Sequence, residues 1–142
     1  MNNIEYRFIR ANSINLRVAM AGPQDGEPVI LLHGFPDASF GWEKQMKALA
    51  DAGYYIVAPD QRGYNLSDKP KGKENYKMNL LVSDVLGLAD ALHFPRFNLA
   101  GHDFGGLVSW KLVDSHPERV KRLAILNVPH PKIMTEFVKT NR

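Results

Sequence analysis

The stretch that decides the fold is "LAGHDFGGLVSW" at residues 99–110, in which an aspartate stands between a histidine and two glycines. A short apolar run precedes the aspartate, and a helix-like segment follows it. A strand that turns at once into a helix needs small residues beside the turn, and Gly101 and Gly105 lie two positions either side of Asp103. This spacing predicts a sharp strand-to-helix turn that lifts the Asp103 side chain out of the sheet.

Outward from this turn, strand-like and helix-like segments alternate along the chain. Apolar and polar side chains alternate at 3–10 and 14–20, around "ANS", and predict an antiparallel hairpin. Apolar runs predict buried strands at 29–34, 54–60, 96–101 and 120–128, and helical patterns predict helices at about 40–51, 76–93 and 104–117. This order predicts the α/β fold class, with a doubly wound, mostly parallel sheet that has helices on both faces.

Asp103 has two interpretations, a helix N-cap or a nucleophile. Aspartate often fills the N-cap position, so the turn by itself favours the first interpretation. The segment "HGFPD" at 33–37 favours the second, because it follows a neighbouring strand and adds a second loop at the same edge of the sheet. The backbone N–H groups of Phe35 and Phe104 would then form an oxyanion hole. We therefore expect Asp103 to be a nucleophile served by these two donors.

Six further residues are expected to support this site: His33, Gly34, Pro36, Gly101, His102 and Gly105. Pro36 lacks an N–H group and restricts Phe35, and we expect a cis peptide bond between the two. His102 flanks the turn and cannot face Asp103, so we interpret it as a packing or hydrogen-bonding neighbour rather than a base. The others belong to the oxyanion loop or provide space beside the turn.

Composition limits the function classes. The chain has 142 residues, 44% hydrophobic and 23% charged, enough for one globular domain with a sizeable core. It contains no cysteine, which excludes disulfides, thiol catalysis and cysteine-ligated zinc and favours a cytoplasmic location. The net charge is +3, and we interpret the densest basic group, at 69–77, as a solvated loop. We see no signal peptide and no membrane-length apolar run, and we expect neither a nucleic-acid nor a membrane partner.

The sequence resembles the N-terminal half of an α/β-hydrolase of the epoxide hydrolase and haloalkane dehalogenase branch. Four stretches carry the resemblance: "LLHGFPDASFGW", "APDQRGYNLSDKP", "AGHDFGGLVSW" and "LNVPHP". It implies that residues 1–128 form the N-terminal part of the core domain, truncated before the last strands of the sheet. It also implies that residues 129–142 lead into a cap domain that is absent.

The same resemblance implies a two-step mechanism. Asp103 attacks an epoxide carbon and forms an alkyl-enzyme ester. A histidine oriented by a carboxylate then activates the water that hydrolyses this ester, while the N–H groups of Phe35 and Phe104 stabilise the oxyanion. In the family, paired cap-domain tyrosines hold the epoxide oxygen. The expected substrate is a small, apolar epoxide, and no metal or organic cofactor is implied.

Details of the motifs favour an epoxide hydrolase over its relatives. Haloalkane dehalogenases typically follow the nucleophile with a tryptophan, and many have an asparagine before the proline of the oxyanion loop. This sequence has Phe104 and Phe35 at those positions. Fluoroacetate dehalogenases use arginines just after the nucleophile, where this chain has Phe104 and Leu107. Haloalkane dehalogenase chemistry stays as an alternative.

The catalytic histidine and its acid are not found in this sequence. The family order is nucleophile, acid and then histidine, and none of the five histidines fits: His33, His93, His102, His116 and His130. Some relatives carry the acid at the position of Asn127, which has no charge. We therefore expect activity only with a complementing C-terminal half. We also expect a second polypeptide that supplies cap, acid and histidine, or self-association of this chain, to cover the faces meant for the absent half. The alternative is an inactive fragment that acts as an oligomer or binding module.

Overall fold

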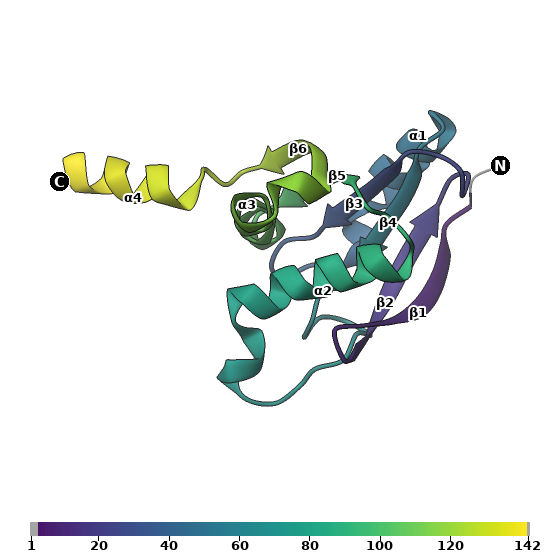
Figure 1. Cartoon of the computed structure of the whole chain (residues 1–142), viewed down its shortest axis with the longest axis horizontal. Helices are drawn as coiled ribbons and strands as arrows, with labels where there is room; N and C mark the ends of the chain where they lie inside the picture. The colour runs from purple at the N-terminus through teal and green to yellow at the C-terminus, as the bar shows by residue number, and fades with distance from the viewer. Residues whose placement is uncertain (1–2, 142) are drawn as a thin grey trace.

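The computed structural model describes residues 3–141 of the chain and contains one six-stranded sheet. The sheet has the strand order β1-β2-β4-β3-β5-β6 (Figure 1). The strands are β1 (Glu5–Ala11), β2 (Ile14–Ala21), β3 (Pro28–Leu32), β4 (Tyr55–Pro59), β5 (Phe97–His102) and β6 (Val120–Leu126). The helices are α1 (Glu43–Asp51), α2 (Met78–Ala91), α3 (Phe104–Ser115) and α4 (Pro131–Thr140). Short 3₁₀ turns cover Ser39–Trp42, Lys73–Tyr76 and Pro117–Arg119.

The sheet is mixed and mostly parallel, as predicted. β1 pairs with β2 and β2 with β4 in antiparallel fashion, whereas β3–β4, β3–β5 and β5–β6 are parallel pairs. β4 is buried at every position and β3 at all but its first, which is why their sequences read as unbroken apolar runs. The carboxyl ends of β3, β4 and β5 therefore meet along one edge of the sheet.

Each face of the sheet is covered by its own helical layer. Ile30 and Leu32 of β3 pack into the larger core together with α2 and α3, while Val29 and Leu31 pack on the opposite face with Met46 of α1. This alternation follows from the period of two along a strand. The structure thus confirms the doubly wound α/β arrangement.

The chain ends on an exposed helix. Figure 1 shows α4, drawn in yellow, projecting away from the sheet beyond β6. Its large apolar side chains are exposed: Ile133, Met134, Phe137 and Val138. The domain boundary after residue 128 stays a prediction. Within residues 3–141, no helix has the length and apolar character needed to cross a membrane.

Several element boundaries predicted from the sequence are wrong by a few residues, and three of them have a clear local cause. The helix expected from residue 40 begins with a 3₁₀ turn, and its α-helical part starts at Glu43. The helix expected to reach His93 ends at Ala91, and His93 takes a φ of +62°, a left-handed conformation that stops a helix. The last strand ends at Leu126 rather than at residue 128, because Asn127 takes a φ of +70°.

Candidate active site

Asp103 lies at the junction between β5 and α3, where the backbone turns sharply. Its φ of 54° and ψ of −120° place it in a region that residues with a side chain rarely adopt. The Asp103 N–H donates to the Leu126 carbonyl at 3.1 Å, which ties the turn to the end of β6. Its side chain makes no capping hydrogen bond to α3. The aspartate therefore does not act as an N-cap.

The Asp103 carboxylate is held instead by the loop that follows β3. Its Oδ2 accepts a hydrogen bond from the Phe35 N–H at 3.0 Å. This hydrogen bond from Phe35 and, after it, the nearby backbone N–H of Phe104 hold the pKa of Asp103 below its ordinary value, and His102 acts in the same direction. The carboxylate thus contacts one of the two donors predicted from the sequence, the Phe35 N–H.

Three glycines leave the space that this turn needs. A Cβ atom added at Gly34 would lie 2.6 Å from the Asp103 Cβ. A Cβ at Gly101 would overlap the Gly105 carbonyl oxygen, and a Cβ at Gly105 would overlap the Leu32 carbonyl oxygen. These backbone atoms cannot move aside without shifting a strand or the helix. The loop after β3 and the start of α3 therefore approach as closely as they do only with glycine at these positions.

His33 fixes the shape of the loop after β3 through both of its ring nitrogens. It is 1% exposed, and burial lowers its pKa. Nε2 accepts the Gln61 N–H at 3.0 Å, so Nδ1 carries the proton and donates to the Gly34 carbonyl at 2.8 Å. The expected cis peptide bond between Phe35 and Pro36 is present. With both nitrogens engaged, His33 has no free position to act as a base toward Asp103.

None of the other four histidine side chains is hydrogen-bonded to Asp103 in the part of the chain that the structure describes. His102 lies with Nε2 3.1 Å from the Asn127 Nδ2, and His116 lies with Nδ1 2.9 Å from the Ser115 Oγ. His130 pairs with Asp114 at 2.8 Å, a contact that sequence analysis missed because the two residues belong to different elements. His93 lies just after α2. Among residues 3–141, no histidine side chain hydrogen-bonds to Asp103.

Tyr64 is a further member of the site that sequence analysis missed. Its ring centroid lies 4.7 Å from that of His33, 6.5 Å from that of Phe35 and 6.4 Å from that of Phe104. Burial raises the pKa of Tyr64, and the charge of Asp103 raises it further, so its hydroxyl stays protonated at neutral pH. Tyr64, Phe35 and Phe104 line a cavity of about 320 Å³ beside the turn. Phe35 is 70% exposed, so its side chain is a wall of this space rather than core.

A buried ion pair holds the loop that carries Tyr64. Arg62 donates from Nε and Nη2 to the two carboxylate oxygens of Asp84 at 2.9 and 2.8 Å, with side chains 5% and 6% exposed. Asn12, in the turn between β1 and β2, donates to the same carboxylate at 2.9 Å. Arg62 also donates to the Asn75 carbonyl farther along the loop. The pair thus ties the loop to α2 and to the first hairpin.

We expect the variant Asp84→Asn to lower the free energy of unfolding by about 2 kcal/mol, because it leaves the buried Arg62 charge without its counter-charge. Urea unfolding followed by circular dichroism measures the change. The exposed pair Lys47–Glu43 offers the control, since Glu43→Gln is expected to cost less than about 0.5 kcal/mol. Equal losses in the two variants would contradict the structural role of the Arg62–Asp84 pair.

Comparisons with known proteins agree with this fold. A sequence model of the alpha/beta hydrolase fold matches residues 27–141. The chain is 46% identical over 134 residues to the "AB hydrolase superfamily protein YfhM" of Bacillus subtilis. The aligned region covers 94% of this chain and 47% of that protein. It is 43% identical over 123 residues to "Epoxide hydrolase A" of Mycobacterium tuberculosis. Here the aligned region covers 87% of this chain and 38% of that protein.

A solved structure supports the same family assignment. The crystal structure of Epoxide Hydrolase A from Mycobacterium thermoresistibile superimposes with a TM-score of 0.88 at 37% identity, over 97% of this chain and 44% of that one. The chain therefore belongs to the α/β-hydrolase fold family, in the branch that contains the epoxide hydrolases. It spans less than half the length of the relatives named here.

Proposed function

We propose that this chain supplies the nucleophile of an epoxide hydrolase-type reaction, with Asp103 as the attacking group. One observation carries the proposal: the Asp103 carboxylate does not cap its helix but accepts the Phe35 N–H at 3.0 Å, in a strained turn between β5 and α3. A carboxylate oxygen would form a bond to an epoxide carbon, and the ring C–O bond would break with its electron pair on the epoxide oxygen. That oxygen then takes up a proton from solvent water, which leaves a hydroxyalkyl ester on Asp103.

The same two backbone donors suit the second step. When water attacks the ester carbonyl, negative charge develops on the carbonyl oxygen, and fixed N–H groups stabilise such charge without having to reorganise. The Phe35 N–H already contacts the Asp103 Oδ2, and the Phe104 N–H also lowers the pKa of this carboxyl. These contacts support the assignment of the two groups as an oxyanion hole.

The water-activating base belongs, in this proposal, to a complementing C-terminal segment. His33 is engaged at both ring nitrogens, and the side chains of His102, His116 and His130 contact partners other than Asp103. A histidine and its acid must therefore come from residues outside these 142, in the same protein or in a second polypeptide. Ring opening itself can proceed without them, with solvent water as the proton source. Without them the ester formed on Asp103 is expected to persist.

Covalent capture of styrene oxide tests this function on the chain as it is. The 142-residue protein is incubated with the epoxide, and intact-mass spectrometry follows the fraction of chains that gain one epoxide. The account predicts a single addition, and peptide mapping should locate it at Asp103. Parallel incubation with a chloroalkane distinguishes epoxide hydrolase chemistry from dehalogenase chemistry. The dehalogenase alternative predicts alkylation of the chain with release of chloride. A chain that captures neither reagent would favour the non-catalytic alternative.

The pH dependence of capture reports the ionisation of Asp103. Because its pKa is lowered, the carboxylate stays ionised to lower pH than an ordinary aspartate, and capture falls only as the pH drops through this lowered pKa. We therefore expect the midpoint of the rate profile below the ordinary aspartate value of about 3.9. Circular dichroism at each pH checks that the chain is folded. A midpoint above that value would contradict the role of the Phe35 and Phe104 donors.

A further inference from the structure

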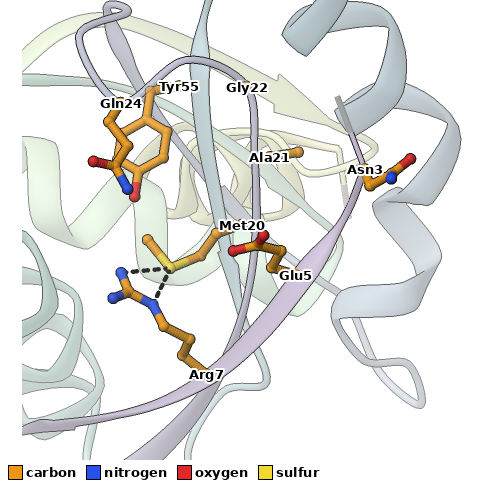
Figure 2. Close-up of a pocket in the computed structure, with 8 residues that line it drawn as sticks. All are labelled: Asn3, Glu5, Arg7, Met20, Ala21, Gly22, Gln24 and Tyr55. Carbon is orange, nitrogen blue, oxygen red and sulfur yellow. Dashed lines mark hydrogen bonds between the residues drawn. The ribbon is translucent and has the colours of Figure 1, made fainter. Parts of the chain in front are cut away.

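A polar cavity of about 290 Å³ lies far from Asp103, where β1 and β2 meet the start of β4. Figure 2 shows the side chains that line it. Tyr55 is the first residue of β4, whereas Asp103 follows the last residue of β5. Since the parallel strands share one direction, the two sites lie at opposite ends of these strands. We call this cavity, lined by Glu5, Arg7, Met20, Gln24 and Tyr55 among others, the hairpin pocket.

Arg7 is the cation of the hairpin pocket, and it lacks an anionic partner. Its Nε and Nη2 donate to the Met20 Sδ at 3.3 and 3.1 Å, drawn as dashed lines in Figure 2. A thioether sulfur is only a weak acceptor, so these bonds orient the guanidinium without neutralising it. Within residues 3–141, no carboxylate lies at ion-pair distance from Arg7. A guanidinium held this way presents its planar fork of donors to a carboxylate.

Two uncharged polar groups converge on the same space. Figure 2 shows the hydroxyl of Tyr55 and the amide of Gln24 side by side, with the Arg7 guanidinium pointing toward them. Tyr55 is mostly buried, and burial raises the pKa of its hydroxyl above the ordinary value, although the charge of Arg7 opposes the shift. The hydroxyl is therefore protonated at neutral pH and can donate to an anion beside Arg7.

Glu5 adds a negative charge to the lining of the same pocket. It precedes Arg7 by two residues in β1, so the two side chains leave the same face of the strand. Glu5 is also unpaired among the described residues, and its charge acts on Tyr55. A ligand with only a carboxylate would meet this charge unfavourably. A ligand that carries an ammonium group beside its carboxylate would satisfy both side chains.

We propose that the hairpin pocket binds a small zwitterion of the α-amino acid type, with its carboxylate on Arg7 and Tyr55 and its ammonium group on Glu5. This site uses none of the residues assigned to the reaction of Asp103. It is a second binding site, and its test does not depend on the outcome of the tests of the proposed function.

Titration of the ¹⁵N-labelled 142-residue chain tests the site, with amide shifts of Met20, Gly22 and Tyr55 as the readout. Three probes separate the two charges: L-alanine carries both, acetate carries the carboxylate alone, and methylammonium carries the cation alone. L-alanine is expected to give saturable shifts at these amides, with an affinity at least about threefold above that of acetate. Methylammonium is expected to give none. Equal affinities for L-alanine and acetate, or no saturable shift with L-alanine, would overturn the proposal.

Matched variants assign the contacts. Arg7→Gln is expected to lower the affinity for L-alanine at least about tenfold, because it removes the charge-assisted bidentate hydrogen bonds. Arg10→Gln removes the same charge three residues along β1, outside the lining of the pocket, and is expected to change the affinity less than about twofold. Glu5→Gln is expected to bring L-alanine down to the affinity of acetate. All three positions are exposed, so the spectra should show folded chains. Equal effects of Arg7→Gln and Arg10→Gln would refute the site.

Discussion

The variant Asp103→Asn is expected to capture styrene oxide at least about 1000-fold more slowly than the parent chain, a difference of about 4 kcal/mol in activation free energy. A carboxylate attacks carbon through a negatively charged oxygen, whereas an amide oxygen is a much weaker nucleophile. The amide keeps the size of the side chain and an oxygen that can accept the Phe35 N–H, so the turn should remain intact. The rate of mass increase under pseudo-first-order conditions measures the effect.

Asp37→Asn is the matched control for this prediction. Asp37 belongs to the same loop as Phe35, and its Oδ1 accepts the Ala38 N–H at 2.8 Å rather than a bond from the turn at Asp103. The control should keep the rate of capture within about twofold, since no bond to the nucleophile changes. Capture that survives in Asp103→Asn, or that falls equally in both variants, would contradict the assignment of Asp103 as the nucleophile.

Gly105→Ala is expected to lower the free energy of unfolding by about 3 kcal/mol or more. The added Cβ would overlap the carbonyl oxygens of Leu32 and His33, and both are backbone atoms at the end of β3. Relief of this overlap requires α3 to move away from the sheet, which disrupts packing on either side of the turn. Urea unfolding measures the loss, and the capture assay should show a matching loss of activity at Asp103.

Gly106→Ala is the control for Gly105→Ala, because it adds the same methyl group to the next residue of α3. A Cβ at Gly106 would lie 3.3 Å from the Ile125 Cγ2, a side-chain atom that can shift slightly. The helix propensity of alanine favours this substitution by up to about 1 kcal/mol, which offsets the contact. We expect a net change below about 1 kcal/mol. Similar losses in Gly105→Ala and Gly106→Ala would show that the close approach at Gly105 is not special.

The features that sequence analysis predicted correctly are those with local causes. The Gly-x-Asp-x-Gly spacing predicts the turn at Asp103 because the steric needs of a strand-to-helix turn fall on residues within a few positions of it. The cis peptide bond before Pro36 was likewise predicted from two adjacent residues. The unbroken apolar runs predicted which strands are buried on both faces. For the roles of Phe35, Phe104 and Asp103 in catalysis, the sequence gives a prediction that still needs the capture assay.

The features that it missed depend on which distant elements meet. Tyr64 approaches Asp103 because the buried Arg62–Asp84 pair, 22 residues apart in sequence, holds the intervening loop against α2. His130, in the connection between β6 and α4, contacts Asp114 of α3. The hairpin pocket forms only where Tyr55 of β4 lies beside β2 and β1. No periodicity or short motif encodes these encounters, because they arise from the packing of complete elements.

The lifetime of the adduct on Asp103 is the measurement that tests the central claim most directly. The 142-residue chain is mixed with excess styrene oxide, the epoxide is removed, and intact mass and peptide maps are recorded over time together with the diol in solution. The account predicts one epoxide per chain, bound at Asp103 and stable after removal of the reagent, with no catalytic formation of diol. Absence of an adduct, or an adduct that maps elsewhere, would contradict Asp103 as the nucleophile. Repeated turnover to diol by this chain alone would contradict the claim that the base lies outside it.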